Sequence, residues 1–409
     1  MKKNVLCLIC SSLLHRFMDF GKMPIANGFL LPKDFKKEYF FNLDVAFCSK
    51  CTMVQLTEFV DREKMFHKNY AFYSSTSARM AKHFEDFANS VIKSHSNNSK
   101  TFVVEIGSND GIMLKNFVHK GTKHLGIEPS ANVAAEAVKN GVNTIVEFFD
   151  EKVAEEIIKK YGQADFFLGA NVICHIPYIH SIMAGVKKLL KPKGLFMFEE
   201  PYVGDIVKKI SYDQIYDEHA FFFSARSIGN LASMHDLELI DVIPQDVHGG
   251  SMRYVIGHKG TSPKKPFVAA CLRKEKKLGL DKIETYQKFA KDIQKSKNDL
   301  VATLIKLKKD GKRVVGYAAT SKSTTILNYC NIGPDLIEFI SDTTPIKHGK
   351  FSPGMHIPIK PYEEFKNDYP DYAVLFAWNH GEEIMAKEKE FIKNGGRWIT
   401  FAPAPVKVI

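Results

Sequence analysis

Residues 101–115 read Thr-Phe-Val-Val-Glu-Ile-Gly-Ser-Asn-Asp-Gly-Ile-Met-Leu-Lys and hold the most informative pattern in the chain. A short apolar, β-branched run at 102–106 leads into a turn of small and polar residues, and an amphipathic run begins at Ile112. This order predicts a strand, a tight turn and a helix. Gly107 and Gly111 let the backbone turn sharply, and they leave room for a ligand beside the helix N-terminus.

The turn departs from the dinucleotide-binding fingerprint G-x-G-x-x-G. Ser108 and Asn109 stand within it, so two of the three glycines are replaced or displaced. Those glycines are needed for the tight turn and for close approach of a pyrophosphate. A Rossmann dehydrogenase is therefore disfavoured.

The same segment resembles the E/D-x-G-x-G-x-G motif of class I S-adenosylmethionine methyltransferases, with Glu105 as the acidic residue and Asn109 at the middle glycine position. Downstream, residues 123–129 predict a second strand that ends on Glu128, about 20 residues further on, where a carboxylate can accept both ribose hydroxyls. The resemblance implies S-adenosylmethionine as cofactor. The expected cofactor contacts are Glu105, Gly107, Asn109, Asp110, Glu128, Phe149 and Asn171.

Length and composition indicate a soluble globular protein with more than one domain. A chain of 409 residues is too long for one ordinary core, so we expect two or three domains. The net charge is +11, but the lysines are spread along the chain without an arginine-rich arm or a basic tail. This distribution favours solvated surface over a nucleic-acid partner, although it would also attract a phosphate-bearing small substrate.

The N-terminus has some features of a signal peptide, because a lysine pair at 2–3 precedes an apolar run. No small-residue cleavage site follows, since the next residues are His15, Arg16 and Phe17. No run approaches the roughly 18 apolar residues of a membrane span. We therefore expect a cytoplasmic protein without a membrane partner.

Two Cys-x-x-Cys pairs predict a metal site. Cys7 and Cys10 form the first pair, and Cys48 and Cys51 form the second. Each pair can place two thiolates on one turn. Four such sulfurs suit a closed, tetrahedral structural zinc site. Two disulfides are the alternative, which a reducing cytosol disfavours.

Strands and helices alternate from residue 101 to residue 170, which predicts a mostly parallel, doubly wound sheet with ligands at the carboxyl ends of its strands. Residues 147–150, including Phe149, follow the third strand, where the adenine would lie. Residues 169–175 follow the fourth strand, where substrate and methyl donor should meet.

Two further segments concentrate polar side chains that a core does not need. Tyr216, Asp217, Glu218 and His219 stand together before a phenylalanine run, and a solvent-facing helix is the alternative explanation. Residues 69–77 form an aromatic, hydroxyl-rich loop before the methyltransferase region, either a lid or an ordinary surface loop.

The C-terminal third predicts a second open α/β sheet. A lysine-rich stretch at 272–310 is expected to be a solvated connecting helix. Residues 313–325 again indicate strand, turn and helix, and Lys322 with its neighbouring hydroxyls suggests a phosphate cradle at a helix N-terminus. The spacing is not that of a Walker loop.

Taken together, the two Cys-x-x-Cys pairs, Glu-Ile-Gly-Ser-Asn-Asp-Gly-Ile-Met-Leu, Asn-Val-Ile-Cys-His-Ile-Pro-Tyr, Tyr-Asp-Glu-His, Gly-Tyr-Ala-Ala-Thr-Ser-Lys and Leu-Phe-Ala-Trp-Asn-His closely resemble the nucleotide-sugar 3-C-methyltransferases. The resemblance runs from Cys7 to about Trp398. It implies a zinc-binding domain at 1–68, a methyltransferase domain at 69–260, and a linker helix with a Rossmann-like nucleotide-sugar-binding domain at 261–409.

The resemblance also implies the chemistry. A base removes the C3 proton of a 4-keto-6-deoxy sugar linked to a nucleoside diphosphate, usually dTDP, and the carbanion takes the methyl group. We expect His219 to be the base, oriented by Glu218, with His175 and Tyr216 steadying the ketone oxygen. The expected catalytic residues are Tyr70, His175, Tyr216, Glu218 and His219. The expected substrate contacts are Ser321, Lys322, Asp342, Lys347 and Asn379.

Two alternatives stay open from the sequence. An N- or O-methyltransferase would use the same cofactor without needing a base for a carbon acid. A non-catalytic zinc-ribbon module that binds RNA would need interleaved aromatic and basic residues, and the sequence offers none. The nucleoside, the sugar's hydroxyl or amino pattern, the stereochemistry at C3 and the oligomeric state are not fixed, and a monomer is compatible with the sequence.

Overall fold

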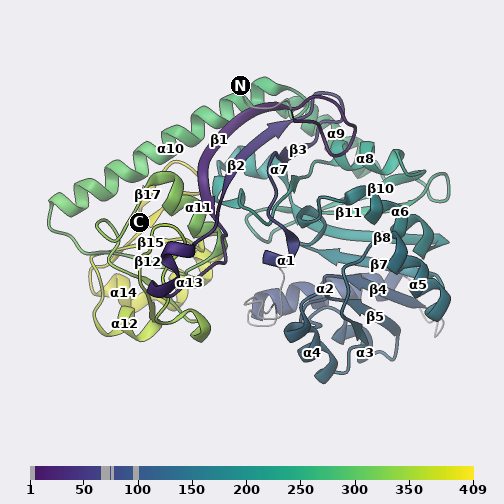
Figure 1. The fold of residues 1–409 in the computed structure, drawn as a ribbon, viewed down its shortest axis with the longest axis horizontal. Helices are drawn as coiled ribbons and strands as arrows, with labels where there is room; N and C mark the ends of the chain where they lie inside the picture. The colour runs from purple at the N-terminus through teal and green to yellow at the C-terminus, as the bar shows by residue number, and fades with distance from the viewer. Residues whose placement is uncertain (1–4, 66–73, 75–77, 95–100) are drawn as a thin grey trace.

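The computed structural model describes residues 5–65, 74, 78–94 and 101–409. Within these residues the chain forms three sheets, with four, seven and six strands. Figure 1 shows how they are arranged. The expected α/β architecture is confirmed. Tyr70 lies outside the described residues.

The N-terminal module is a small antiparallel sheet in the order β1-β2-β3-β9. Its fourth strand belongs to a much later part of the chain, since Val54 of β3 pairs with Phe222 of β9. The module is therefore built directly onto the domain that contains the seven-stranded sheet. Its strands are β1 (His15–Pro24), β2 (Phe40–Phe47), β3 (Val54–Leu56) and β9 (Phe221–Phe222), with a 3-10 helix η1 (Pro32–Lys37) between β1 and β2 and a short α1 (Arg62–Met65) after β3.

The central sheet has the order β10-β11-β8-β7-β4-β5-β6. Strands β6, β5, β4, β7 and β8 are parallel, and β11 is antiparallel to both β8 and β10. The doubly wound sheet predicted from the alternation is thus extended at one edge by an antiparallel hairpin. The strands are β4 (Phe102–Ile106), β5 (Lys123–Ile127), β6 (Thr144–Ile145), β7 (Ala164–Ala170), β8 (Leu190–Pro201), β10 (Leu237–Gln245) and β11 (Ser251–His258).

Helices cover this sheet because their apolar residues recur on one face. In α5, for example, Val153, Ala154 and Ile157 are buried. The amphipathic run after Gly111 differs from expectation: residues 111–114 form turns, and helix α3 begins only at Lys115. The remaining elements are α2 (Ala78–Ser94), α3 (Lys115–Val118), α4 (Ala131–Lys139), α5 (Glu151–Tyr161), η3 (Ile173–His175), α6 (Ile179–Leu189), α7 (Val203–Lys209), η4 (Tyr212–Gln214) and α8 (Ala225–Ser233).

The lysine-rich connection is two helices and not one. Helix α9 (Pro266–Leu278) ends where Gly279 takes a left-handed conformation with φ of 69°, and α10 (Ile283–Lys309) follows. Glycine adopts this conformation without the steric cost other residues meet, so it ends the first helix. Helix α10 buries Tyr286, Phe289 and Ile293 on one face and packs against β1 and α11, with its lysines outward.

The C-terminal sheet has the order β14-β13-β12-β15-β16-β17, parallel except for β17. Helix α11 follows β12, and Thr320 caps it by accepting a hydrogen bond from the Ser323 N–H at 3.1 Å. Its elements are β12 (Val314–Tyr317), α11 (Ser321–Cys330), β13 (Ile340–Asp342), η5 (Pro345–Lys347), β14 (Ile359–Pro361), α12 (Tyr362–Asn367), β15 (Tyr372–Leu375), η6 (Trp378–His380), α13 (Gly381–Lys387), α14 (Lys389–Lys393), β16 (Arg397–Thr400) and β17 (Lys407–Val408).

The N-terminal module also contacts the C-terminal domain. Leu30 and Phe351 form an antiparallel bridge, the Phe35 ring stacks on His356 with centroids 3.7 Å apart, and His356 Nε2 lies 2.8 Å from Glu38 Oε2. The module therefore touches both larger domains. Among the described helices, none has the length and apolar character that crossing a bilayer requires.

Candidate active site and metal centre

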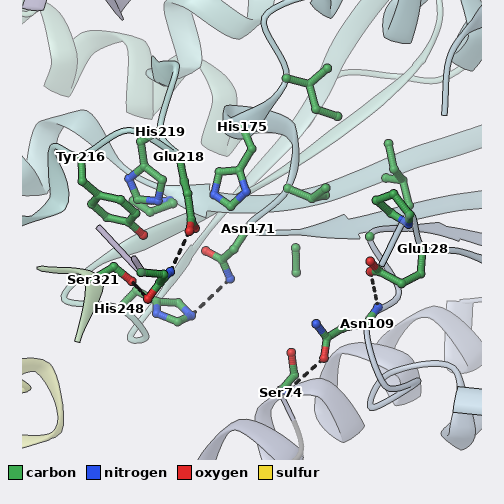
Figure 2. Close-up of a pocket in the computed structure, with 18 of the residues that line it drawn as sticks. Ser74, Asn109, Glu128, Asn171, His175, Tyr216, Glu218, His219, His248 and Ser321 are labelled. Carbon is green, nitrogen blue, oxygen red and sulfur yellow. Dashed lines mark hydrogen bonds between the residues drawn. The ribbon is translucent and has the colours of Figure 1, made fainter. Parts of the chain in front are cut away.

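One cavity of about 340 Å³ lies where the three sheets meet. The carboxyl ends of β4, β5 and β7 contribute to its wall, as do the segments that follow β12 and β15 of the C-terminal sheet. Figure 2 shows Asn109 and Glu128 at one end, His175, Tyr216 and His219 at the other, and Asn171 between them. The arrangement offers one end to a cofactor and the other to an acceptor.

The backbone of the glycine turn, residues 107–111, allows a ligand to approach it closely. Gly107 has φ of 64°, and a Cβ there would come within 2.7 Å of Val172 Cγ2, so a side chain is excluded. Asn109, at the middle glycine position, also has a positive φ, of 48°. Asparagine tolerates this left-handed conformation better than most residues, which explains how the motif survives without that glycine. The Asn109 side-chain oxygen accepts a hydrogen bond from the Ser74 N–H at 3.0 Å.

Glu128 lies just beyond β5 and is buried, with 5% of its surface exposed. One carboxylate oxygen accepts the Asn109 N–H at 3.0 Å and the other accepts the Ser130 N–H at 2.8 Å. Burial raises its pKa. These amides fix the carboxylate at the cavity wall, where a ribose can reach its remaining lone pairs. Glu105 and Asp110 are buried behind the turn and do not line the cavity.

The cofactor end is completed by aromatic side chains. Phe149 is buried and lines the cavity with Phe148. The guanidinium of Arg62 lies 4.2 Å from the centroid of the Phe148 ring and 5.0 Å from that of Tyr178. Arg62, which the sequence did not single out, brings the N-terminal module to this end of the site.

The acceptor end brings together the predicted catalytic residues among those described. The rings of His175 and His219 stack with centroids 5.2 Å apart, and the Tyr216 ring lies 4.2 Å from that of His219. Glu218 lines the same wall. His175 comes from η3, while the other three come from the loop between η4 and β9.

The hydrogen bond of His219 identifies its tautomer. Nδ1 lies 2.7 Å from the carbonyl oxygen of Gln214, and since a carbonyl only accepts, Nδ1 is the donor. Burial, followed by repulsion from His175, lowers the pKa of His219 well below 6.5, so the ring is neutral and Nε2 carries a lone pair. The orienting group is the Gln214 carbonyl and not Glu218, which corrects the expectation. Both side chains line the cavity, but the hydrogen-bond partner of Glu218 is a different residue.

That partner is Asn27, whose side-chain N–H donates to Glu218 Oε1 at 2.7 Å. Burial raises the pKa of Glu218 to about 7, and the Asn27 hydrogen bond acts in the opposite direction. Asp217 beside it accepts the Ala26 N–H at 2.9 Å, and burial raises its pKa as well.

Asn171 and His248 form the middle of the cavity wall. Asn171 has φ of 53°, and its side-chain nitrogen lies 3.2 Å from His248 Nε2. Burial and the charge of Lys322 lower the pKa of His248 to about 3, so the ring is neutral and accepts this hydrogen bond. His248 was missed because the sequence around it indicates only a glycine turn.

One buried carboxylate, that of Glu200, supports the loop that carries His175. Glu200 accepts the N–H groups of Val172, Ile173 and Cys174 at 3.0, 2.7 and 3.3 Å, which holds the backbone that carries His175. Burial raises the pKa of Glu200 to about 7. Neighbouring Glu199 is paired instead with Arg253, whose Nε lies 2.8 Å away.

The C-terminal candidates divide into two groups. Ser321, Lys322 and Asn379 line the cavity, and Lys322 Nζ lies 3.4 Å from Asn379 Oδ1. Asp342 and Lys347 do not line it. Lys347 donates to the Ala319 carbonyl at 2.7 Å and lies 3.4 Å from Asp342, so these two charges tie strand ends together.

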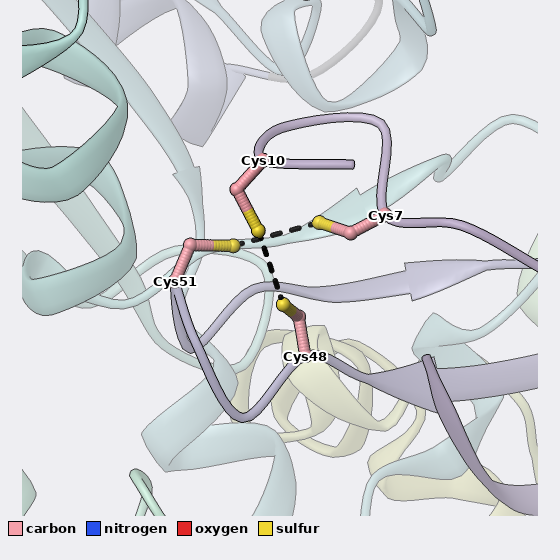
Figure 3. A group of neighbouring side chains, drawn as sticks. All are labelled: Cys7, Cys10, Cys48 and Cys51. Carbon is pink, nitrogen blue, oxygen red and sulfur yellow. Dashed lines mark hydrogen bonds between the residues drawn. The ribbon is translucent and has the colours of Figure 1, made fainter. Parts of the chain in front are cut away.

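The four N-terminal cysteines converge, as Figure 3 shows. The Sγ atoms of Cys7 and Cys51 are 3.5 Å apart, those of Cys10 and Cys48 are 3.4 Å apart, and all four lie within 4.8 Å of one another. None is in a disulfide. A tetrahedral Zn–S bond of about 2.3 Å requires sulfurs about 3.8 Å apart, so the cluster fits zinc.

The sheet order, the glycine turn and the carboxylate after β5 define a class I methyltransferase domain that binds S-adenosylmethionine. Comparison with known proteins extends this. Family models described as "Putative zinc binding domain", "Methyltransferase domain" and "C-methyltransferase C-terminal domain" match residues 7–66, 72–242 and 246–403.

A curated relative, C-methyltransferase NovU of Streptomyces niveus, is 35% identical over 390 residues, which is 95% of this chain and 93% of the relative. The chain therefore belongs to the C-methyltransferase family. Solved structures similar to part of the chain include an S-adenosylmethionine-dependent methyltransferase from Clostridium acetobutylicum (TM-score 0.36, 13% identity, 44% of this chain and 92% of that one) and magnesium protoporphyrin IX methyltransferase from Synechocystis (TM-score 0.33, 10% identity, 44% and 79%).

Proposed function

We propose that this C-methyltransferase methylates C3 of a nucleotide-linked 4-keto-6-deoxy sugar, dTDP being the expected nucleotide. The tautomer of His219 carries the proposal. A neutral imidazole with Nδ1 on a carbonyl presents Nε2 as a base in the part of the cavity that faces away from the cofactor turn. A neutral amine attacks with its own lone pair and needs no such base. A hydroxyl acceptor could use the same imidazole, and here family membership favours carbon over oxygen.

In the proposed reaction, removal of a proton comes before transfer of the methyl group. His219 Nε2 takes the C3 proton, which the neighbouring ketone acidifies, and the electron pair moves into an enolate. S-Adenosylmethionine, when bound, would supply an electrophilic methyl group, with S-adenosylhomocysteine as the leaving group. The new bond joins C3 to that methyl carbon, and His219 later loses its proton to solvent.

Other residues would stabilise the charge that develops. Tyr216 lies against His219, and its hydroxyl is suited to donate to the enolate oxygen. His175, whose pKa burial lowers to about 4, is neutral and so adds no charge that would oppose protonation of His219. Lys322 brings positive charge from the C-terminal domain, where we place the nucleoside diphosphate. Zinc bound by the four cysteines would hold the N-terminal module together.

The decisive experiment uses S-adenosylmethionine with a ¹³C-labelled methyl group and a dTDP-4-keto-6-deoxy sugar. The expected product shows one-bond coupling between the labelled carbon and C3 by NMR. His219→Asn should yield none, although it should bind S-adenosylhomocysteine normally. A methyl ether or methylamine product, or no product with any 4-keto sugar nucleotide, would contradict the proposal.

A further inference from the structure

The turn after β1 reaches into the catalytic cavity. Residues 25–28 turn sharply, with the Gly28 N–H donating to the Ile25 carbonyl at 3.0 Å. Asn27 stands in this turn and lines the cavity. The segment belongs to the same small module as the four cysteines, which lie toward the opposite end of β1.

The main chain of the neighbouring residue is held by both larger domains. The Ala26 N–H donates to Asp217 of the central domain at 2.9 Å, and its carbonyl accepts the Thr324 hydroxyl of α11 at 2.9 Å. These two bonds fix the turn in position. The side chain of Asn27 is not needed for that purpose.

That side chain instead joins two residues of the cavity wall. Asn27 donates to Glu218 at 2.7 Å and accepts the Ser321 hydroxyl at 3.2 Å. Since the amide has one accepting and one donating end, the bond from Ser321 sets which end faces the carboxylate. Figure 2 shows Glu218 and Ser321, the two partners of this amide, close together on the acceptor side of the cavity.

An amide is well suited to this place. Glu218 is buried, which disfavours its ionised form and raises its pKa to about 7, while the hydrogen bond from Asn27 lowers it. A neutral donor stabilises the carboxylate without adding a charge that would compete with Lys322 for an anionic substrate. Removing the donor leaves a buried carboxylate oxygen without that partner, which favours protonation and rotation of the group.

We infer that Asn27 is a positioning residue of the active site: it holds the Glu218 carboxylate in place toward the acceptor and links it to Ser321 on the nucleotide side. The zinc-binding module thereby contributes directly to the catalytic pocket and is more than a structural appendage. The inference rests on the proposed function insofar as Glu218 serves the sugar; the hydrogen bonds themselves do not depend on the substrate.

The test compares Asn27→Ala and the isosteric Asn27→Asp with a matched control, Asn42→Ala. Asn42 lies in the same module and also donates to a carboxylate, Glu58, at 2.8 Å, but on the exposed surface. We expect kcat to fall about tenfold to a hundredfold in both Asn27 variants. Activity should begin to fall at a higher pH in both Asn27 variants than in the wild type as the pH is lowered. This shift should be larger for Asn27→Asp than for Asn27→Ala. Asn42→Ala should match the wild type in both respects, and all variants should bind S-adenosylhomocysteine equally.

Two measurements separate positioning from general damage. Titration of ¹³C-labelled glutamate by NMR, without substrate, should show the Glu218 carboxyl titrating at higher pH in Asn27→Ala. In a Glu218→Gln background, Asn27→Ala should cause little further loss. An unchanged Glu218 titration, or a full additional loss in that background, would overturn the inference. Should the wild-type enzyme reject every 4-keto sugar nucleotide, the proposed function fails, while the substrate-free titration still decides the role of Asn27.

Discussion

The Nδ1 nitrogen of His219 lies 2.7 Å from the carbonyl oxygen of Gln214, five residues earlier in the chain. A backbone carbonyl cannot titrate, so it fixes the tautomer at every pH at which the ring is neutral. The base is thus prepared by local backbone geometry, while Glu218 is left to interact with Asn27. The two adjacent side chains therefore have separate tasks in the same cavity.

If His219 removes the C3 proton, proton exchange should occur without methyl transfer. With S-adenosylhomocysteine in place of the methyl donor, the enzyme should exchange the C3 hydrogen of the sugar with D₂O faster than free substrate does. His219→Ala and His219→Asn should abolish this exchange while both ligands still bind. Persistent exchange with loss of methyl transfer would assign the base to Tyr216 or His175 and leave His219 a positioning role.

The pH dependence of kcat/KM should separate the carboxyl group from the imidazole. Burial raises the pKa of Glu218 to about 7 and lowers that of His219 well below 6.5. The ionised carboxylate exists above its pKa and stabilises the imidazolium that forms on His219. Activity should therefore fall as the pH drops through about 7. Glu218→Gln should have lower activity, and its kcat/KM should not show this fall near pH 7. A wild-type kcat/KM that falls only well below pH 6.5 would contradict the prediction.

Cofactor affinity should depend on Glu128. If its carboxylate accepts ribose hydroxyls, Glu128→Ala should weaken S-adenosylhomocysteine binding by about 1–3 kcal/mol, the range for hydrogen bonds to a charged group. The mutation also frees the Asn109 and Ser130 amides, so circular dichroism should confirm the fold. Glu136→Ala, at an exposed ion pair on α4, is the control and should bind normally by calorimetry.

The four-cysteine cluster should hold about one zinc ion per chain. Cys48→Ala should lose the metal and destabilise the N-terminal module, since the remaining three sulfurs cannot close a tetrahedral site. Cys271→Ala, outside the cluster, should retain it. Elemental analysis together with hydrogen exchange over residues 5–60 makes the comparison. Protein that is free of metal yet equally protected in this region would exclude a structural zinc.

The sequence predicted those parts of the site that depend on local pattern. Glu128 follows a strand at a regular distance from the glycine turn, and the catalytic loop is a short run of polar residues before phenylalanines, so both could be recognised without tertiary information. Asn27 could not, because its partner Glu218 lies 191 residues away and no motif surrounds it. His248 was also missed, because its partner Asn171 lies 77 residues away and the surrounding sequence indicates only a glycine turn.

Where the structure differs from what the sequence pattern predicts, the reason is a local interaction that the pattern does not show. Asp342 and Lys347 stand at a strand end, where ligands bind in open sheets, but their charges pair with each other. The break between α9 and α10 at Gly279 was overlooked because the lysine-rich pattern continues on both sides.

In the C-terminal domain, substitutions of Lys322 and Lys347 should change different properties of the enzyme. Lys322 lines the cavity, so Lys322→Ala should raise the KM for the sugar nucleotide about tenfold or more and leave cofactor binding unchanged. Lys347→Ala breaks the bond to Ala319, so it should cost about 1–3 kcal/mol of stability with little change in KM.

Exposed Lys366, on α12 of the same domain, supplies the control, because Lys366→Ala should alter neither quantity. Steady-state kinetics, calorimetry with S-adenosylhomocysteine and thermal unfolding make the comparison for all three variants. A Lys322 variant that weakens both ligands equally would show that cofactor and nucleotide do not bind in separate parts of the cavity. A Lys347 variant with normal stability and raised KM would return that residue to the substrate site.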